Sequence, residues 1–161
     1  MAGKSPTSKN LREANIPGIV ILAAEWHEEI IQSLLVGCLN TLKENGINLK
    51  TVVVRRVPGS FELPLASSWY LQKDSTKAVI CLGCVIKGET QHDEIINHSI
   101  AKAFQDLNLK FGKPLLNGVI TTNNKKQAKS RAGGKHGNKG SDCASAALKM
   151  LLLKEEVDNL K

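Results

Sequence analysis

Aromatic residues make up only 4% of this 161-residue chain, and one of them, Phe111, lies in its most basic segment. A protein that stacks the bases of single-stranded nucleic acid needs more aromatic side chains along its basic surface. The scarcity of aromatic residues therefore argues against a nucleic-acid partner, although the positive net charge of +7 leaves that alternative open.

Long apolar runs are also missing, and we expect no signal peptide. No run reaches the roughly 18–20 apolar residues that a transmembrane helix requires, so no membrane association is expected. Of the four cysteines, only Cys81 and Cys84 form a C-x-x-C pair, and no second pair completes a zinc site. The pair sits in an apolar run, which favours core packing over the helix N-terminus that a redox pair prefers. We expect reduced thiols in a cytoplasmic protein.

Acidic residues are absent between Asp106 and Asp142. Since the cations in this interval sum to +8 and the chain carries +7, the rest of the chain carries −1. We therefore expect one basic face, suited to nucleic acid, a phosphorylated metabolite or another subunit. The cations are Lys110, Lys113, Lys125, Lys126, Lys129, Arg131, Lys135 and Lys139.

Short apolar runs alternate with segments of helical spacing. This order predicts an α/β, three-layer, flavodoxin-like fold with a central four-stranded parallel sheet and helices on both faces. We expect a single domain over residues 1–161, with 1–12 as a flexible N-terminal segment. The expected strands cover residues 19–23, 51–54, 78–86 and 114–121, and the helices 30–42, 61–73, 90–110, 124–132 and 139–157.

Ligands of parallel sheets bind at the carboxyl ends of the strands. The segments that follow the expected strands contain residues that could carry the chemistry of a site. They are 25–27, 58–62, 87–92 and the stretch from Thr121 to Arg131. His92 would lie in the first turn of a helix, suited to proton transfer near neutral pH. The alternative is that Thr90 only caps the helix and that His92 only faces solvent; likewise Ser60 is a candidate cap.

Two further features have both a functional and an ordinary interpretation. Trp26 is placed to stack on a flat ring, or else to cover the edge of the core. Segment 131–140 has four glycines and no acid, which suits a bound anion or a solvated loop. Its glycines miss the dinucleotide-binding pattern, and no Walker A motif exists. His27, His98 and His136 lack the spacing of metal ligands, so no metal is expected.

Four motifs, taken together, resemble the lumazine synthase family, which acts in riboflavin biosynthesis. The resemblance covers roughly residues 17–155. It implies condensation of 5-amino-6-(D-ribitylamino)uracil with 3,4-dihydroxy-2-butanone 4-phosphate, without metal or organic cofactor. The motifs are VPGSFELP at 57–64, GCVIKGETQH at 83–92, GVIT at 118–121 and RAGGKHGNKG at 131–140.

The resemblance also implies roles for single residues. His92 matches the family's proton-transfer residue. The butanone phosphate would be held by Glu89, Thr90 and Arg131. The ribitylaminouracil would be held by Trp26, Ser60, Phe61, Glu62, Cys84, Val85, Ile86, Asn117 and Lys139.

Three positions depart from the family's common pattern. Trp26 and Asn117 each stand where phenylalanine is frequent, and Asp142 stands where glutamate is frequent. The larger ring of Trp26 raises the alternative of a flavin or lumazine carrier without turnover. The shorter Asp142 puts any contact to Lys139 in question.

The family resemblance implies a homopentamer with its sites between neighbouring subunits. Arg131 and Lys139 would come from the adjacent subunit. Segment 131–140 carries no insertion of the kind found in pentamer-only relatives, so we expect twelve pentamers in an icosahedral shell of 60 subunits. Riboflavin synthase, which uses the product, is a candidate partner.

Overall fold

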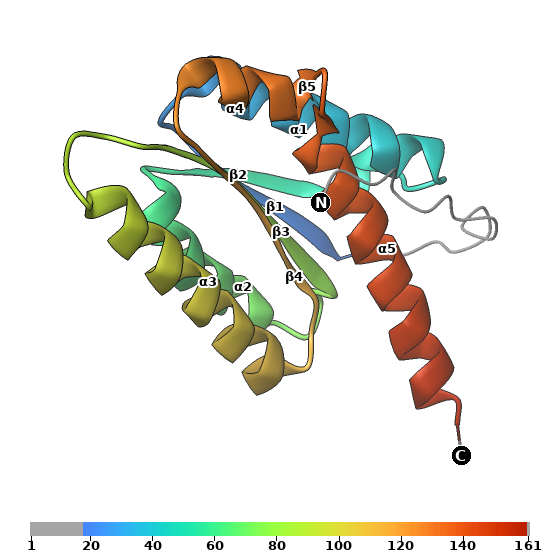
Figure 1. The fold of residues 1–161 in the computed structure, drawn as a ribbon. Helices are drawn as coiled ribbons and strands as arrows, with labels where there is room; N and C mark the ends of the chain where they lie inside the picture. Colours follow the sequence, from blue (N-terminus) through green and yellow to red (C-terminus); the bar gives the residue numbers. More distant parts are fainter. Residues whose placement is uncertain (1–17, 161) are drawn as a thin grey trace.

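Four parallel strands form the central sheet in the computed structural model, which describes residues 18–160 (Figure 1). The expected flexible segment 1–12 lies outside the described residues. The strands are β1 (Ile19–Ala24), β2 (Val53–Val57), β3 (Ala78–Ile86) and β4 (Leu115–Thr122), and their spatial order is β2-β1-β3-β4. All three pairings are parallel, which confirms the predicted sheet.

Helices cover both faces of this sheet, as the sequence predicts. The helices α1 (Glu28–Glu44) and α5 (Lys139–Asp158) pack against one face, and α2 (Leu63–Leu71) and α3 (His92–Phe111) cover the other (Figure 1). A short helix, α4 (Lys125–Arg131), follows β4. The result is the predicted three-layer, flavodoxin-like arrangement.

Strand β3 supplies side chains to both cores. Ile80, Leu82 and Cys84 pack on the α1 and α5 side, whereas Val79 and Cys81 pack on the α2 and α3 side. Successive side chains of a strand point to opposite faces, so a strand covered on both sides must be apolar throughout. Cys81 and Cys84 are buried and free, which confirms that this C-x-x-C pair packs in the core.

Several predicted boundaries were wrong. Strand β2 covers 53–57 rather than 51–54, because Leu49–Thr51 forms a 3-10 helix capped by the Asn48 side chain. Ser60 is not a helix cap; it begins a second 3-10 helix, Ser60–Glu62, that leads into α2. Helix α3 begins at His92, and the Thr90 side chain does not cap it.

The glycine-rich segment forms a small antiparallel hairpin, β5 (Ala132–Gly134) and β6 (Gly137–Asn138), between α4 and α5. The Asn138 side chain accepts hydrogen bonds from Gly140 N (2.8 Å) and Ser141 N (3.2 Å), which caps α5. The same side chain donates to Ser33 O on α1 (2.8 Å). One asparagine therefore both starts α5 and fixes the hairpin to α1.

The expected basic face does not take in the whole acid-free interval. Lys113 donates to Leu71 O and Lys73 O (2.8 Å each), near the amino ends of β3 and β4, whereas α4 follows the carboxyl end of β4. The cations of the acid-free interval are thus divided between opposite ends of the sheet. Between residues 18 and 160, no helix has the length and apolar character to cross a membrane.

Candidate functional site

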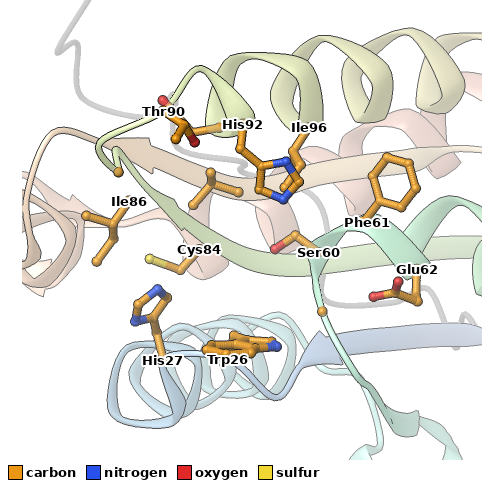
Figure 2. A pocket seen from close by; sticks show the side chains of 14 residues that line it. Trp26, His27, Ser60, Phe61, Glu62, Cys84, Ile86, Thr90, His92 and Ile96 are labelled. Carbon is orange, nitrogen blue, oxygen red and sulfur yellow. The ribbon is translucent and has the colours of Figure 1, made fainter.

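A cavity of about 490 Å³ opens at the carboxyl ends of β1, β2 and β3, and we call it the first cavity (Figure 2). It gathers residues from four of the segments that follow or end these strands. Its lining residues are Trp26, His27, Gly59, Ser60, Phe61, Glu62, Cys84, Val85, Ile86, Gly88, Thr90, His92, Asp93 and Ile96.

The end of β3 contributes an apolar wall to the first cavity. Cys84 and Val85 are buried and Ile86 is half-buried. Burial raises the pKa of the Cys84 thiol to about 11, so it stays protonated near neutral pH. A protonated, buried thiol packs as a small apolar group and does not act as a nucleophile.

Trp26 lies two residues beyond the carboxyl end of β1, and 71% of its surface is exposed. The Glu25 N–H donates to Val57 O (2.9 Å), which ties the end of β1 to the end of β2. Trp26 therefore does not cover the core edge in this chain. Its ring lies along one side of the first cavity, across from His92 (Figure 2).

His27 holds a left-handed backbone conformation, with φ 63° and ψ 47°. Among residues 18–160 it is the one non-glycine residue with positive φ. Its carbonyl accepts hydrogen bonds from Ile30 N (2.8 Å) and Ile31 N (3.1 Å), which starts α1. The backbone begins the helix, and the imidazole is left to line the cavity.

Segment 59–62 places a hydroxyl, an aromatic ring and a carboxylate along the cavity. Ser60 is buried, and a Cβ built on Gly83 would lie 2.6 Å from its Oγ, so β3 passes close beneath this segment. A Cβ on Gly59 would lie 3.0 Å from Glu62 Oε2 and 3.5 Å from Trp26 Cδ1. The lack of a side chain at Gly59 thus keeps open the space between Glu62 and Trp26.

The fourth group of residues comes from segment 87–96. Lys87 N donates to Thr122 O (2.8 Å), which joins the ends of β3 and β4. The chain then turns into α3, whose first residue, His92, directs its imidazole toward Ser60 (Figure 2). Thr90 and His92 line the cavity. Glu89 lies in the same turn and is exposed, but its side chain is not part of the lining.

Arg131 lies elsewhere, in a second cavity of about 530 Å³ at the end of β4. Three cations and a histidine line it, with hydroxyl and amide side chains and no acid. Lys125 and Lys129 do not line it; their Nζ atoms lie 3.5 Å and 2.6 Å from the carboxylate oxygens of Glu29. The lining residues are Thr121, Thr122, Asn124, Lys126, Gln127, Ser130, Arg131, Lys135 and His136.

Two other expected site residues also lie away from the first cavity. Asn117 lines a third cavity of about 360 Å³ with Asn97 and His98, and its Oδ1 accepts from Val119 N (3.0 Å). Lys139 is the first residue of α5, beyond the hairpin. One chain therefore brings together Trp26 and His92 but not the expected residues of β4, α4 and α5.

Sequence reasoning missed two residues of the first cavity, Asp93 and Ile96, which lie on α3 beyond the segments expected to follow the strands. Three others, His27, Gly59 and Gly88, lie inside the expected segments but received no role. Asp93 and Ile96 follow His92 by one residue and by one helical turn, so their place on the same helix was the available signal. Within residues 18–160, no three His, Cys, Asp or Glu side chains gather in a way that could hold a metal ion.

Comparison with known proteins finds one family throughout. The sequence profile of 6,7-dimethyl-8-ribityllumazine synthase matches residues 17–155. A protein of that name from Cytophaga hutchinsonii is 50% identical, over 81% of this chain and 82% of its own. Those from Porphyromonas gingivalis and Xanthomonas campestris pv. campestris are each 41% identical, over 90% and 84% of this chain and 86% and 88% of their own.

Proposed function

Because the chain belongs to the 6,7-dimethyl-8-ribityllumazine synthase family, we propose that it condenses 5-amino-6-(D-ribitylamino)uracil with 3,4-dihydroxy-2-butanone 4-phosphate. The products are 6,7-dimethyl-8-ribityllumazine, phosphate and water, in the penultimate step of riboflavin biosynthesis. The observation that carries this proposal is the family match over residues 17–155, with residues of two of the four motifs, 57–64 and 83–92, gathered around the first cavity. The reaction takes no metal or organic cofactor.

The first cavity offers the groups that the uracil substrate needs. The exposed Trp26 ring is a stacking surface for the pyrimidine. Ser60, Phe61 and Glu62 supply a hydroxyl, an apolar face and a carboxylate for the ring edge and the ribityl chain. Cys84, Val85 and Ile86 form the apolar wall beside the ring.

His92 is the proposed proton-transfer residue. The substrate amine adds to the ketone to give a carbinolamine, which loses water to give an imine; each step moves a proton. An imidazole carries protons near neutral pH, and His92 lies inside the cavity at the start of α3. Much of the rate enhancement comes from holding the two substrates in register.

The butanone phosphate is proposed to lie near Glu89 and Thr90, where backbone N–H groups precede α3. Arg131 adds a guanidinium that suits a phosphate group and stabilises it as it leaves. Since Arg131, Lys139 and Asn117 of one chain lie apart from the first cavity, a neighbouring subunit supplies them in this proposal.

The proposed assembly is a homopentamer of single-domain chains, with twelve pentamers in a 60-subunit shell. The incomplete first cavity of one chain supports shared sites, and the absence of an insertion in segment 131–140 favours the shell. We place the protein in the cytoplasm, with small-molecule substrates and without nucleic-acid or membrane partners; riboflavin synthase is the proposed protein partner.

The test is a mixing assay that follows the absorbance of the lumazine product. We expect His92→Ala to lower kcat roughly a hundredfold and Arg131→Ala to raise KM for the butanone phosphate roughly tenfold or more. Lys110→Ala, far from both cavities on α3, is the control. An unchanged KM for the phosphate substrate in Arg131→Ala would contradict the assigned role.

The shared site has its own test. Chains carrying His92→Ala and chains carrying Arg131→Ala are co-expressed, so that mixed oligomers form. If sites lie between subunits, some mixed sites hold both native residues, and activity rises above that of either variant alone. Activity no higher than the average of the two variants would contradict a shared site.

A further inference from the structure

The imidazole of His27 lines the first cavity but has no structural task. His27 is the N-cap residue of α1, yet its side chain makes no capping hydrogen bond. Within residues 18–160, no hydrogen bond or ion pair involves this imidazole. The side chain is exposed, so a molecule held in the cavity can reach both of its ring nitrogens.

The backbone at His27 makes any side chain at this position costly. Its left-handed conformation penalises a residue that carries a Cβ, whereas glycine adopts it freely. The start of α1 uses only the His27 carbonyl, which glycine would also supply. Residues held in such conformations concentrate at functional sites. The helix therefore gives no reason for an imidazole here, and the cavity that it lines does.

The position of the imidazole matches one edge of the proposed uracil site. Strands β1 and β3 are paired neighbours, so the residues that follow β1 lie beside the end of β3. Figure 2 shows His27 next to Trp26 and turned toward Cys84 of the apolar wall. Glu62 lies on the other side of the Trp26 ring (Figure 2). A flat ring stacked on Trp26 thus presents one edge to Glu62 and another to His27.

We propose that His27 hydrogen-bonds the uracil ring of 5-amino-6-(D-ribitylamino)uracil at the edge opposite Glu62. This inference rests on the proposed function. A neutral imidazole has one N–H donor and one acceptor nitrogen, so it can pair with a ring carbonyl or a ring N–H, whereas an ionised carboxylate only accepts. The two side chains differ in what they pair with, and together they fix which way round the ring lies on Trp26.

Position and charge favour the uracil over the butanone phosphate as the partner of His27. His27 precedes α1, whereas Thr90, near which the phosphate is proposed to lie, precedes α3 on the opposite face of the sheet (Figure 1). No lysine or arginine lines the first cavity. The next charged residue along the chain, Glu28, is already paired with Arg56. A phosphate dianion finds no free cation beside His27 in this chain, and an uncharged ring needs none.

Two substitutions separate the imidazole from the backbone that carries it. His27→Gly removes the ring and relaxes the backbone, so we expect Kd for the uracil substrate to rise roughly tenfold while the thermal midpoint does not fall. His27→Asn keeps a donor and an acceptor and tolerates the left-handed backbone, so Kd should stay within about threefold of the wild type. Lys110→Ala, near the other end of α3, is the control and should match the wild type.

The measurements are Kd for the uracil substrate alone, from quenching of tryptophan fluorescence, and kcat and KM for each substrate. A His27→Gly protein that binds the uracil substrate as tightly as Lys110→Ala would overturn the proposal. A rise in KM for the butanone phosphate alone would overturn it too, because the imidazole would then serve the other substrate. The same holds for a fall in kcat at unchanged Kd, which would make His27 a proton carrier.

Stability and assembly provide the remaining checks. A thermal midpoint of His27→Gly several degrees below the wild type, or a loss of oligomer mass in light scattering, would give the imidazole a structural role and overturn the proposal. A wild-type protein that binds the uracil substrate through His27 but forms no lumazine would overturn the proposed function and leave this binding role. Lumazine formation by the wild type, with His27→Gly equal to it in Kd, would overturn the inference alone.

Discussion

The two cavities at the carboxyl edge of the sheet differ in chemistry although they lie at the ends of adjacent strands. The first combines an apolar wall, an exposed tryptophan ring, two histidines and two carboxylates. The second has three cations, one histidine and several hydroxyl and amide groups, with no acid. One suits a flat polar heterocycle and proton transfer, and the other suits an anion.

This difference shows how one sheet edge separates two tasks. The Lys87 N–H bond to Thr122 O joins the ends of β3 and β4, so the two cavities rest on one rigid base. Yet the carboxylates of the first cavity are kept apart from the cations of the second, which favour phosphate. In the proposed oligomer, the second cavity of one subunit serves the first cavity of its neighbour.

The largest effect should follow from a change in the scaffold of the second cavity. A Cβ at Gly140 would lie 2.0 Å from the backbone oxygen of Leu34, which cannot move aside cheaply. We expect Gly140→Ala to cost about 3 kcal/mol and to lower the thermal midpoint by about 10 °C. Calorimetry measures this.

Gly88→Ala is the matched control at the first cavity, since a Cβ there meets nothing within 4 Å. Its midpoint should stay near that of the wild type. Equal midpoints for the two variants would show that α1 and α5 tolerate separation, and that the hairpin is not rigidly held.

The next effect concerns the aromatic side of the first cavity, where the chain offers a matched pair of tryptophans. Trp26 and Trp69 are 71% and 59% exposed, but only Trp26 lines the cavity. The uracil substrate should quench the fluorescence of Trp69→Phe and leave that of Trp26→Phe nearly unchanged. Trp26→Ala should weaken binding roughly tenfold. Quenching that survives in Trp26→Phe would remove the stacking role.

A smaller effect, from the four buried cysteines, should appear in alkaline solution. Burial raises the pKa of Cys38 and Cys81 to about 12 and of Cys84 and Cys143 to about 11, from 9.0. Because the unfolded thiols lose their protons first, the contribution of the thiols to the free energy of unfolding should be constant below pH 9 and fall as pH rises through 9 to 12. Denaturation curves at stepped pH measure this fall.

The same burial predicts that a thiol reagent at pH 8 labels no cysteine until the protein unfolds. Cys84 is the informative residue, because it alone of the four lines the first cavity. Rapid labelling of Cys84 in the folded protein would show that the apolar wall opens.

The smallest effect is expected at Glu29. Its hydrogen bond to Lys129, and more weakly its pairing with Lys125, lower the pKa of this fully exposed carboxyl. We expect Glu29→Gln to leave stability unchanged at physiological salt and to strengthen sulfate binding slightly at low salt, because two cations are released near the second cavity. Glu44→Gln, at the other end of α1, is the control. A several-degree loss of thermal stability would contradict this weak role.

The sheet and its covering helices were predictable because their signals are local. Apolar runs such as 78–86 can only be buried strands when helical segments separate them, and a parallel sheet then follows. The boundaries at Thr51 and Thr90 were not predictable, because turn geometry decides them: Asn48 caps a 3-10 helix in one case, and α3 starts late in the other.

The candidate site was predictable to the extent that its residues follow strands. Trp26, Ser60 and His92 meet in the first cavity, as expected from the carboxyl-end rule. The division of the basic interval could not be read from the sequence, because Lys113 and Arg131 are close in number but lie at opposite ends of β4.

The left-handed backbone at His27 constrains which substitutions the chain can accept there. Asparagine, aspartate and glycine adopt this conformation readily, whereas β-branched residues rarely do. In a saturation library, position 27 should therefore behave like a turn position despite its exposed side chain. Valine or isoleucine would tilt the first turn of α1 and move the neighbouring Trp26 ring. The backbone conformation, before side-chain chemistry, therefore restricts which amino acids position 27 can hold beside this cavity.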